Sequence, residues 1–173
     1  MSFTSRFTRL SLYARGQLRG YHRVRIGPRV KLGGTGTYDL RPGSAIRAGT
    51  RIWVGPGATL TLERGSAIGA NCVVNVETGI HLGPGSQVSW GVQLLDTDFH
   101  AITDDDGVVH PHTSPIVIGA HVLVGTGVMI LKGVSLGDGS IVAAGSVVTR
   151  SVEPGVVVGG NPARPIGRSR DWN

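Results

Sequence analysis

Several residue types are scarce in this chain of 173 residues, and each scarcity excludes a class of protein. A single cysteine, Cys72, cannot form an internal disulfide, which excludes a disulfide-stabilised secreted scaffold. No apolar run reaches the roughly 18 residues that a membrane-spanning helix needs, and the N-terminus lacks the continuous apolar segment of a signal peptide. We therefore expect a cytoplasmic protein.

Large rings are also scarce, because aromatic residues make up only 5% of the chain whereas glycine occurs 28 times. The core must then consist mainly of Val, Ile, Leu and Ala side chains. Such a composition is typical of many short strands separated by turns. The length favours one fold domain.

The strongest pattern in the chain is a repeat of six residues. Aliphatic residues recur in one register at Ile118, Val124, Ile130, Leu136, Val142 and Val148. Four residues after each of them stands a small or β-branched residue, at Val122, Val128, Val134, Ser140, Ser146 and Val152. Because residues two apart on a strand face the same side, each repeat is expected to place two side chains inward. The same spacing recurs upstream, from Ile46 to Leu94, with small insertions near Leu60 to Ser66 and at His81.

The repeat also predicts where the chain turns. Gly127, Gly133, Gly139 and Gly145 share one position in the repeat, and His121 occupies the same position. A left-handed backbone suits this position, since glycine adopts it without steric cost and histidine is enriched there. One repeat cannot bury its own apolar face, so successive coils must stack as a solenoid. Three repeats give a triangular coil of about 18 residues, with parallel strands about 4.8 Å apart and six to eight coils in total.

The N-terminal segment departs from this repeat and lacks acidic residues. Seven arginines precede the first acidic residue, and the chain carries a net charge of +6. Apolar residues recur there at helical spacing, at Phe3, Phe7, Leu10, Ala14 and Leu18, which predicts an amphipathic helix within residues 1–22. Such a helix caps the solenoid, packs on a neighbouring subunit or attaches peripherally to a membrane. Its arginines are either solvated or face anionic lipid, phosphate or nucleic acid.

The repeat is interrupted between Leu94 and Ile118, where the segment LLDTDFHAI leads into an acidic stretch with Gly107 and Pro111. This composition predicts a loop, residues 98–117, that projects from the solenoid. Loops on a rigid scaffold commonly carry chemistry. The solenoid itself is expected over residues 23–166, followed by a tail of residues 167–173.

DTDFH, the loop and the closing run VVTRSVEPGVVVGGNPARPI resemble the hexapeptide-repeat acyltransferases. The resemblance is to the maltose and galactoside acetyltransferase branch, which includes polysaccharide O-acetyltransferases. It implies an all-β, left-handed parallel β-helix that assembles as a homotrimer, with each active site shared by two subunits. It also implies transfer of an acetyl group from acetyl-CoA to a hydroxyl of a sugar or glycan precursor. A longer acyl donor such as succinyl-CoA stays open.

The family's general base corresponds here to His100. A base near neutral pKa removes the proton of an acceptor hydroxyl, which otherwise attacks a thioester poorly. Asp98, Asp96 or a backbone carbonyl would orient the imidazole, and Asp98 is preferred. Cys72 is the alternative nucleophile, but its place in the inward register predicts a buried apolar role and hence direct transfer.

For the acyl donor, the resemblance points to five residues near the end of the solenoid: Thr126, Ala144, Thr149, Arg150 and Arg164. The two arginines would neutralise phosphate oxygens. Leu123 stands where the family commonly has a tryptophan. On the acceptor side, we expect Asn71, Asn75 and Trp90, although an asparagine also suits a turn and a tryptophan also packs.

Two other classes of function compete with this interpretation. A γ-type carbonic anhydrase on the same scaffold binds zinc through three histidines, but here Thr126 stands five residues after His121, and His110 and His112 form a lone His-Pro-His pair. No metal is therefore expected. A non-catalytic module that docks on a membrane leaves His100 and the closing run unexplained. Nucleic-acid binding is not expected, since basic and aromatic residues do not interleave along the coils.

Overall fold

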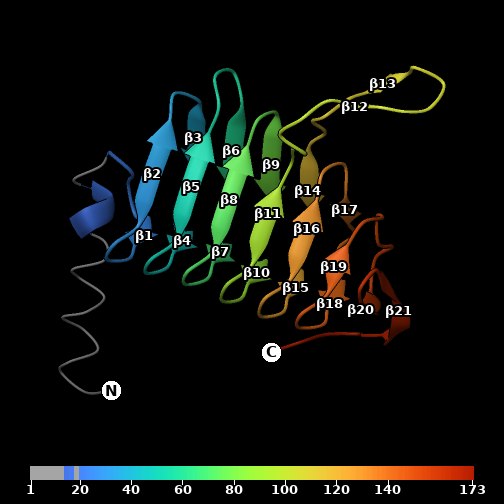
Figure 1. The fold of residues 1–173 in the computed structure, drawn as a ribbon. Helices are drawn as coiled ribbons and strands as arrows, with labels where there is room; N and C mark the ends of the chain where they lie inside the picture. The colour runs from blue at the N-terminus through green and yellow to red at the C-terminus, as the bar shows by residue number, and fades with distance from the viewer. Residues whose placement is uncertain (1–13, 18–19) are drawn as a thin grey trace.

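The computed structural model describes residues 14–17 and 20–173, which form a parallel β-solenoid of about seven turns (Figure 1). The fold class predicted from the repeat is confirmed. Three parallel sheets form its sides, here called faces A, B and C.

Up to β17, each coil contributes one short strand to each face in turn. Face A contains β1 (Arg25–Ile26), β4 (Ala45–Ile46), β7 (Ala67–Ile68), β10 (Gln87–Val88), β15 (Leu123–Val124), β18 (Ile141–Val142) and β20 (Val156–Gly160). Face B contains β2 (Lys31–Gly34), β5 (Arg51–Val54), β8 (Val73–Val76), β11 (Gln93–Leu95), β16 (Met129–Leu131) and β19 (Val147–Val148). Face C contains β3 (Thr37–Leu40), β6 (Thr59–Leu62), β9 (Gly79–Leu82), β14 (Ile116–Ile118) and β17 (Ser135–Leu136).

The pairing register reproduces the predicted period. Leu123 pairs with Ile141, eighteen residues further along the chain. In the earlier coils the period is longer, since Ala45 pairs with Ala67. The strands of face C are longer in these coils, with four residues in β6 and two in β17. The slips in the sequence repeat are therefore small enlargements of early coils.

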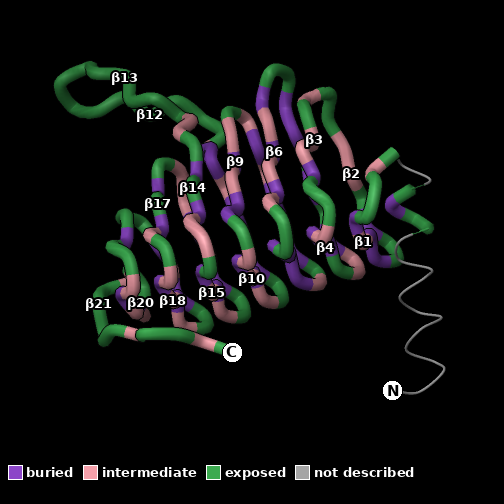
Figure 2. Tube along the Cα trace, turned by 180° about the vertical axis from the view of Figure 1, so that it is seen from behind, coloured by how far each residue is buried: buried purple, intermediate pink, exposed green. Residues whose placement is uncertain are grey.

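The core is a single column of aliphatic side chains inside the prism. Every member of the two predicted inward sets is buried, from Ile118 and Val122 to Val148 and Val152. Figure 2 shows buried segments that recur along the successive coils. The coils stack so that each apolar layer covers the next, which removes apolar area from water.

The predicted corner conformation is also confirmed. His121 has a φ of 53° and Gly127 a φ of 69°, both in the left-handed region. An L-residue with a Cβ pays a steric cost there, so glycine predominates at these corners.

Two element boundaries differ from the prediction. Strand β14 begins at Ile116, so the chain returns to the solenoid before the expected end of the loop at 117. At the other end, β21 (Ala163–Arg168) pairs antiparallel with β20 and continues past Ile166. The antiparallel pairing covers the last edge of face A, which the sequence repeat gives no means of predicting.

The expected N-terminal helix falls mostly outside the described residues. Residues 14–17 are helical, while Phe3, Phe7, Leu10 and Leu18 lie in the part that the structure does not describe. Within residues 14–17 and 20–173, no helix has the length and apolarity needed to cross a membrane.

The C-terminal tail is held against the solenoid by a contact with His121. The rings of Trp172 and His121 stack with centroids 4.4 Å apart, and the Trp172 indole N–H donates to the His121 carbonyl at 2.7 Å. The imidazole Nε2 of His121 lies 2.7 Å from Asp171 Oδ1. This contact fixes the predicted tail, residues 167–173, beside the corner that precedes β15.

We expect the tail contact to weaken in acid. The hydrogen bond with the His121 ring, followed by that from the Trp172 backbone N–H, lowers the pKa of Asp171 below its ordinary 3.8. A lowered folded-state pKa means that the stabilisation is complete above the ordinary value and is lost as the pH falls through the lowered one. The measurement is the fluorescence difference between wild type and Trp172→Phe as a function of pH. An acid transition that Asp171→Asn retains would contradict the assignment.

Candidate active site

The loop that carries His100 leaves the solenoid at the corner between faces B and C, here called the B/C corner. Thr97 and Thr113 form an antiparallel bridge at its base, and the Asp98 N–H donates to the His112 carbonyl at 2.7 Å. Further out, β12 (Ile102–Thr103) pairs with β13 (Val109–His110) as a hairpin. Both views show the hairpin projecting away from the coils (Figures 1 and 2). The predicted excursion is therefore an exposed hairpin on an ordered base.

Asp96 anchors this base from inside the protein. It is fully buried, and its Oδ1 accepts from the Glu77 N–H at 2.7 Å. Its Oδ2 accepts from the N–H groups of Thr78 and Gly79, both at 2.8 Å, and from the Thr78 hydroxyl at 2.9 Å. The carboxylate thus accepts the hydrogen bonds of the backbone N–H groups in the turn before β9. Asp96 is one of the groups predicted to orient His100, but in the structure its carboxylate is bound to this turn.

Asp98, the preferred orienting group, contacts a different residue in the structure. Its Oδ2 lies 2.7 Å from Lys132 Nζ, and both side chains are partly exposed. Lys132 also donates to the Pro111 carbonyl, on the returning side of the loop. Lys132 stands on the next coil, directly after β16, so it ties the outgoing and returning segments to the solenoid. Lys132 was not predicted as a site residue from the sequence. Its only distinguishing feature there is that it is a lysine at a corner, in a chain with very few lysines.

Replacing Lys132 should loosen the loop base without unfolding the solenoid. Lys132→Met removes the Asp98 contact and the Pro111 hydrogen bond, and a partly exposed ion pair of this kind contributes only about 1 kcal/mol or less. We expect faster hydrogen exchange at the Asp98 and Ser114 amides and a global unfolding midpoint close to wild type. Lys132→Arg, which keeps the charge, is the matched control. Unchanged exchange at both amides in Lys132→Met would contradict the anchoring role.

His100 stands just beyond the base and is exposed. It follows Phe99, whose φ of 63° turns the backbone sharply at this point. Within the described chain, the imidazole makes no hydrogen bond or ion pair, and Asp98 faces Lys132 rather than this ring. A solvent-accessible imidazole on a fixed base has the chemistry of a general base toward a bound hydroxyl.

Three of the predicted site residues stack on the corner between faces A and B, here called the A/B corner. Trp90, Thr126 and Ala144 occupy it in three successive coils, and all three are exposed. The Gly127 N–H donates to the Trp90 carbonyl at 2.9 Å, and the Gly145 N–H donates to the Thr126 carbonyl at 2.8 Å. These bonds place the acceptor-side residue Trp90 beside the coil of Thr126, which in turn lies beside the coil of Ala144.

The other two acceptor-side residues, Asn71 and Asn75, lie apart from each other in the structure. Asn71 lies at the A/B corner with a φ of 57°, the left-handed conformation of a corner residue. Asn75 lies on β8 of face B and lines an open groove of about 410 Å³ with Arg51 and Trp53. The structure therefore brings Asn71 and Trp90 to one corner and places Asn75 on the adjacent face.

Arg150 and Arg164 come together at the C-terminal end of the solenoid. Both line a cavity of about 210 Å³ whose walls include Val148, Ala163 and Pro165. Arg150 follows β19 at the B/C corner, with Thr149 exposed beside it, and Arg164 comes from β21. Two guanidinium groups at one cavity suit an anion with several oxygens. The five predicted donor residues thus form two groups: Thr126 and Ala144 lie at the A/B corner, and the other three lie at the C-terminal end of the solenoid.

Two histidines that the zinc interpretation considered have carboxylate partners. His110 Nε2 lies 2.8 Å from Asp104 Oδ2 within the hairpin, and His121 pairs with Asp171. Over residues 14–17 and 20–173, the structure has no group of three side chains placed to hold a metal ion.

Cys72 lies in the core, as its register predicted. It is buried, and its thiol donates to the Ser89 carbonyl at 3.1 Å. Burial raises the pKa of this thiol, and the nearby hydrogen bonds only partly oppose that rise. A buried protonated thiol is a poor nucleophile.

We therefore expect Cys72→Ala to keep the wild-type kcat and to lose only about 1 kcal/mol of stability. Turnover of acyl-CoA measures the first quantity and urea unfolding the second. Mass spectrometry of the wild-type enzyme during turnover serves as the control, with no acylated Cys72 expected. Loss of activity in a folded Cys72→Ala protein would contradict direct transfer.

The chain is similar in sequence to a family model and to a known protein. A family model described as the hexapeptide repeat of succinyl-transferase matches residues 59–95 and 115–150. An uncharacterized 24.8 kDa protein in the cps region of Klebsiella pneumoniae is 49% identical over 109 residues, which cover 59% of this chain and 48% of that protein. The chain therefore spans about half the length of this curated relative.

Among solved structures, the polysialic acid O-acetyltransferase OatWY is similar with a TM-score of 0.75 and 25% identity, over 87% of this chain and 76% of that one. A single-residue mutant of AntD, an N-acyltransferase from Bacillus cereus solved with dTDP-4-amino-4,6-dideoxyglucose and coenzyme A, has a TM-score of 0.60 and 18% identity. That alignment covers 86% of this chain and 82% of AntD, and at this identity it speaks for the fold alone. In the repeats that the family model matches and in its coil architecture, the chain is similar to the hexapeptide-repeat acyltransferases.

Proposed function

We propose that the protein transfers an acetyl group from acetyl-CoA to a hydroxyl of a sugar or glycan precursor, with His100 as general base. The observation that carries the proposal is the exposed imidazole of His100 on an ordered loop base of an acyltransferase solenoid. A base near neutral pKa is the group that an alcohol needs before it attacks a thioester.

The donor side rests on the cavity lined by Arg150, Arg164 and Glu153 and on the A/B corner. Arg150 and Arg164 offer directional donors to phosphate oxygens of coenzyme A. The small exposed residue Ala144 and its neighbour Thr126 leave room for a thin pantetheine arm along the corner. A protein of the same fold, AntD, has been solved with coenzyme A, which supports an acyl-CoA donor.

The proposed acceptor is a hydroxyl of a glycan. OatWY, which shares the solenoid, is a polysialic acid O-acetyltransferase, and this supports a hydroxyl on a glycan. A histidine base serves an amine acceptor equally well, so the product must be identified chemically.

We further propose a homotrimer in which each site is shared. His100 leaves the solenoid at the B/C corner, whereas Thr126 and Ala144 lie at the A/B corner, across the width of face B. Within one copy, the base and the donor corner lie on opposite edges of face B. Around a three-fold axis, the B/C corner of one copy can lie against the A/B corner of the next, which brings the base of one copy to the donor corner of its neighbour.

The test is incubation of the purified protein with acetyl-CoA and a panel of oligosaccharides. Release of free coenzyme A and a mass gain of one acetyl group on the glycan are expected, and hydroxylamine should remove that group because it is an ester. An acetyl group that resists hydroxylamine identifies an amide and overturns O-transfer. No coenzyme A release with any glycan, while succinyl-CoA is consumed, overturns the acetyl donor. A monomer in light scattering overturns the shared site.

A further inference from the structure

We infer that the groove beside Trp90 binds the acceptor and selects a sugar that carries a carboxylate or phosphate group. This inference rests on the proposed function, since it names the acceptor class of the same site. Its evidence is that the exposed indole of Trp90 lines the same groove as Arg25 and Arg47.

The groove lies across face A and the A/B corner of the first coils. It has a volume of about 460 Å³, and its lining includes Trp90, Arg25, Arg47, Ala48 and Ala70. Trp90 is 66% exposed, so the indole face is open to a ligand. An exposed tryptophan offers an apolar face on which the C–H side of a sugar ring packs. The volume lies in the range of small-molecule sites.

One N–H group of the Arg25 side chain has no hydrogen-bond partner in the structure. Arg25 lies on β1 and is half-buried, and its Nε is buried without any hydrogen-bond acceptor. Buried polar groups in proteins are almost always paired, so this N–H is an exception within the wall of the groove. The guanidinium carries further N–H donors on its two Nη atoms, and a carboxylate or phosphate in the groove would accept from those.

The surroundings of the groove favour an anion. No acidic residue lines it, while Arg25 and Arg47 do. Residues 20–76 contain eight Lys and Arg side chains against only Asp39 and Glu63, and residues 77–173 contain more acids than bases. The Asp39 carboxylate is already paired with Arg41 at 2.9 Å. The positive potential of this end of the solenoid would therefore attract a negatively charged sugar chain.

The groove is next to the proposed donor positions. Trp90 is joined to the next coil by the hydrogen bond from the Gly127 N–H to its carbonyl, and Thr126 precedes Gly127. A sugar stacked on Trp90 would therefore lie one coil away from the thioester arm that we place at Thr126 and Ala144. This adjacency distinguishes the groove from the other basic surfaces of the protein.

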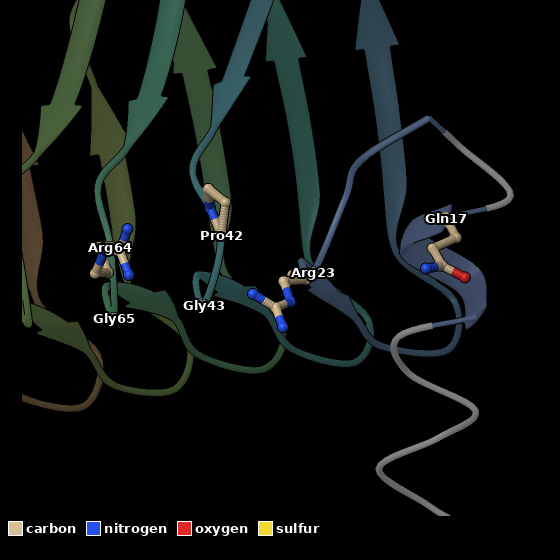
Figure 3. A pocket seen from close by; sticks show the side chains of 6 residues that line it. All are labelled: Gln17, Arg23, Pro42, Gly43, Arg64 and Gly65. Atoms are coloured by element: carbon tan, nitrogen blue, oxygen red, sulfur yellow. The ribbon is translucent and has the colours of Figure 1, made fainter.

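A second basic cavity, of about 580 Å³, lies at the corner between faces C and A (Figure 3). Its described lining includes Arg23, Arg64 and Gln17, and none of the described lining residues is aromatic. These residues offer charge without a stacking surface, and the cavity lies away from Trp90 and Thr126. The acceptor is therefore assigned to the Trp90 groove.

The test is direct binding, measured with the His100→Ala protein so that no turnover interferes. A microarray that carries sialylated, uronic-acid-containing, phosphorylated and neutral oligosaccharides is the probe. Binding only to acidic glycans is expected. Arg25→Gln and Trp90→Ala should each weaken binding on the order of tenfold, because each removes a charge-assisted hydrogen bond or a stacking surface.

Matched controls are Arg170→Ala, an exposed charge at the far end of the chain, and Val117→Ala, an exposed apolar side chain on face C. Both should bind as the parent does. Preference for neutral glycans, equal losses in the controls, or equal binding of single-stranded DNA would overturn the inference. In the active protein, Arg25→Gln should raise the KM for the acceptor and leave that for acetyl-CoA unchanged. A raised KM for acetyl-CoA alone would reassign the groove to the donor, while the proposed function would stand.

Discussion

Replacing His100 with alanine is expected to lower kcat by about 10²–10⁴-fold, the range that a general base contributes. Without the imidazole, the acceptor hydroxyl keeps its proton while it attacks the thioester. The ring makes no hydrogen bond or ion pair within the described chain, so its removal should leave the fold intact. The measurement is the rate of coenzyme A release at saturating acetyl-CoA and acceptor.

The KM for acetyl-CoA should stay close to wild type in this variant, because the donor positions lie on other coils. His112→Ala is the matched control, since His112 is a second exposed imidazole of the same loop. Wild-type turnover in a folded His100→Ala protein would remove the proposed base. An equal loss in His112→Ala would show that the loop as a whole, rather than one imidazole, is required.

Replacing Asp96 with alanine should give the largest loss of stability, about 3–5 kcal/mol. The substitution removes four hydrogen bonds and leaves the N–H groups of Glu77, Thr78 and Gly79 without their acceptor beneath the loop. Asp96 is fully buried, so water does not replace the carboxylate without opening the turn. The measurement is the free energy of unfolding from urea titration.

Asp98→Ala, two residues away, is the control. Its carboxylate is partly exposed and pairs with Lys132, so its loss should cost about 1 kcal/mol or less. Asp96→Asn should fall between the two, since an amide keeps one oxygen but turns a donor toward backbone N–H groups. Equal destabilisation by Asp96→Ala and Asp98→Ala would contradict the anchoring role of Asp96.

The repeat allowed much of the fold to be predicted, because it is a local pattern. The period of six identifies which side chains point inward, and Val122, Ser140 and Val152 are buried as the register requires. The corner position shared by His121 and the glycines predicted a left-handed backbone that the structure confirms. The small inward register likewise predicted the burial of Cys72.

What the sequence did not reveal depends on contacts between distant coils. Asp96 and Asp98 look alike in LLDTDFHAI, yet one is buried against the turn at Thr78 and the other faces Lys132. The distinction depends on which coil each carboxylate meets, and spacing along the chain does not report that. The contact between His121 and Trp172 joins residues 51 positions apart, and no periodic signal marks it.

The shared site is tested most directly by mixing two inactive variants. His100→Ala lacks the base, and Ala144→Trp blocks the donor corner with a bulky side chain at an exposed position. After the subunits are mixed and reassembled at equal amounts, random trimers should recover about a quarter of the wild-type activity, because a base from one copy meets an open corner of the next. Absence of recovery, in mixed trimers verified by mass spectrometry, would contradict a site built between copies of this chain.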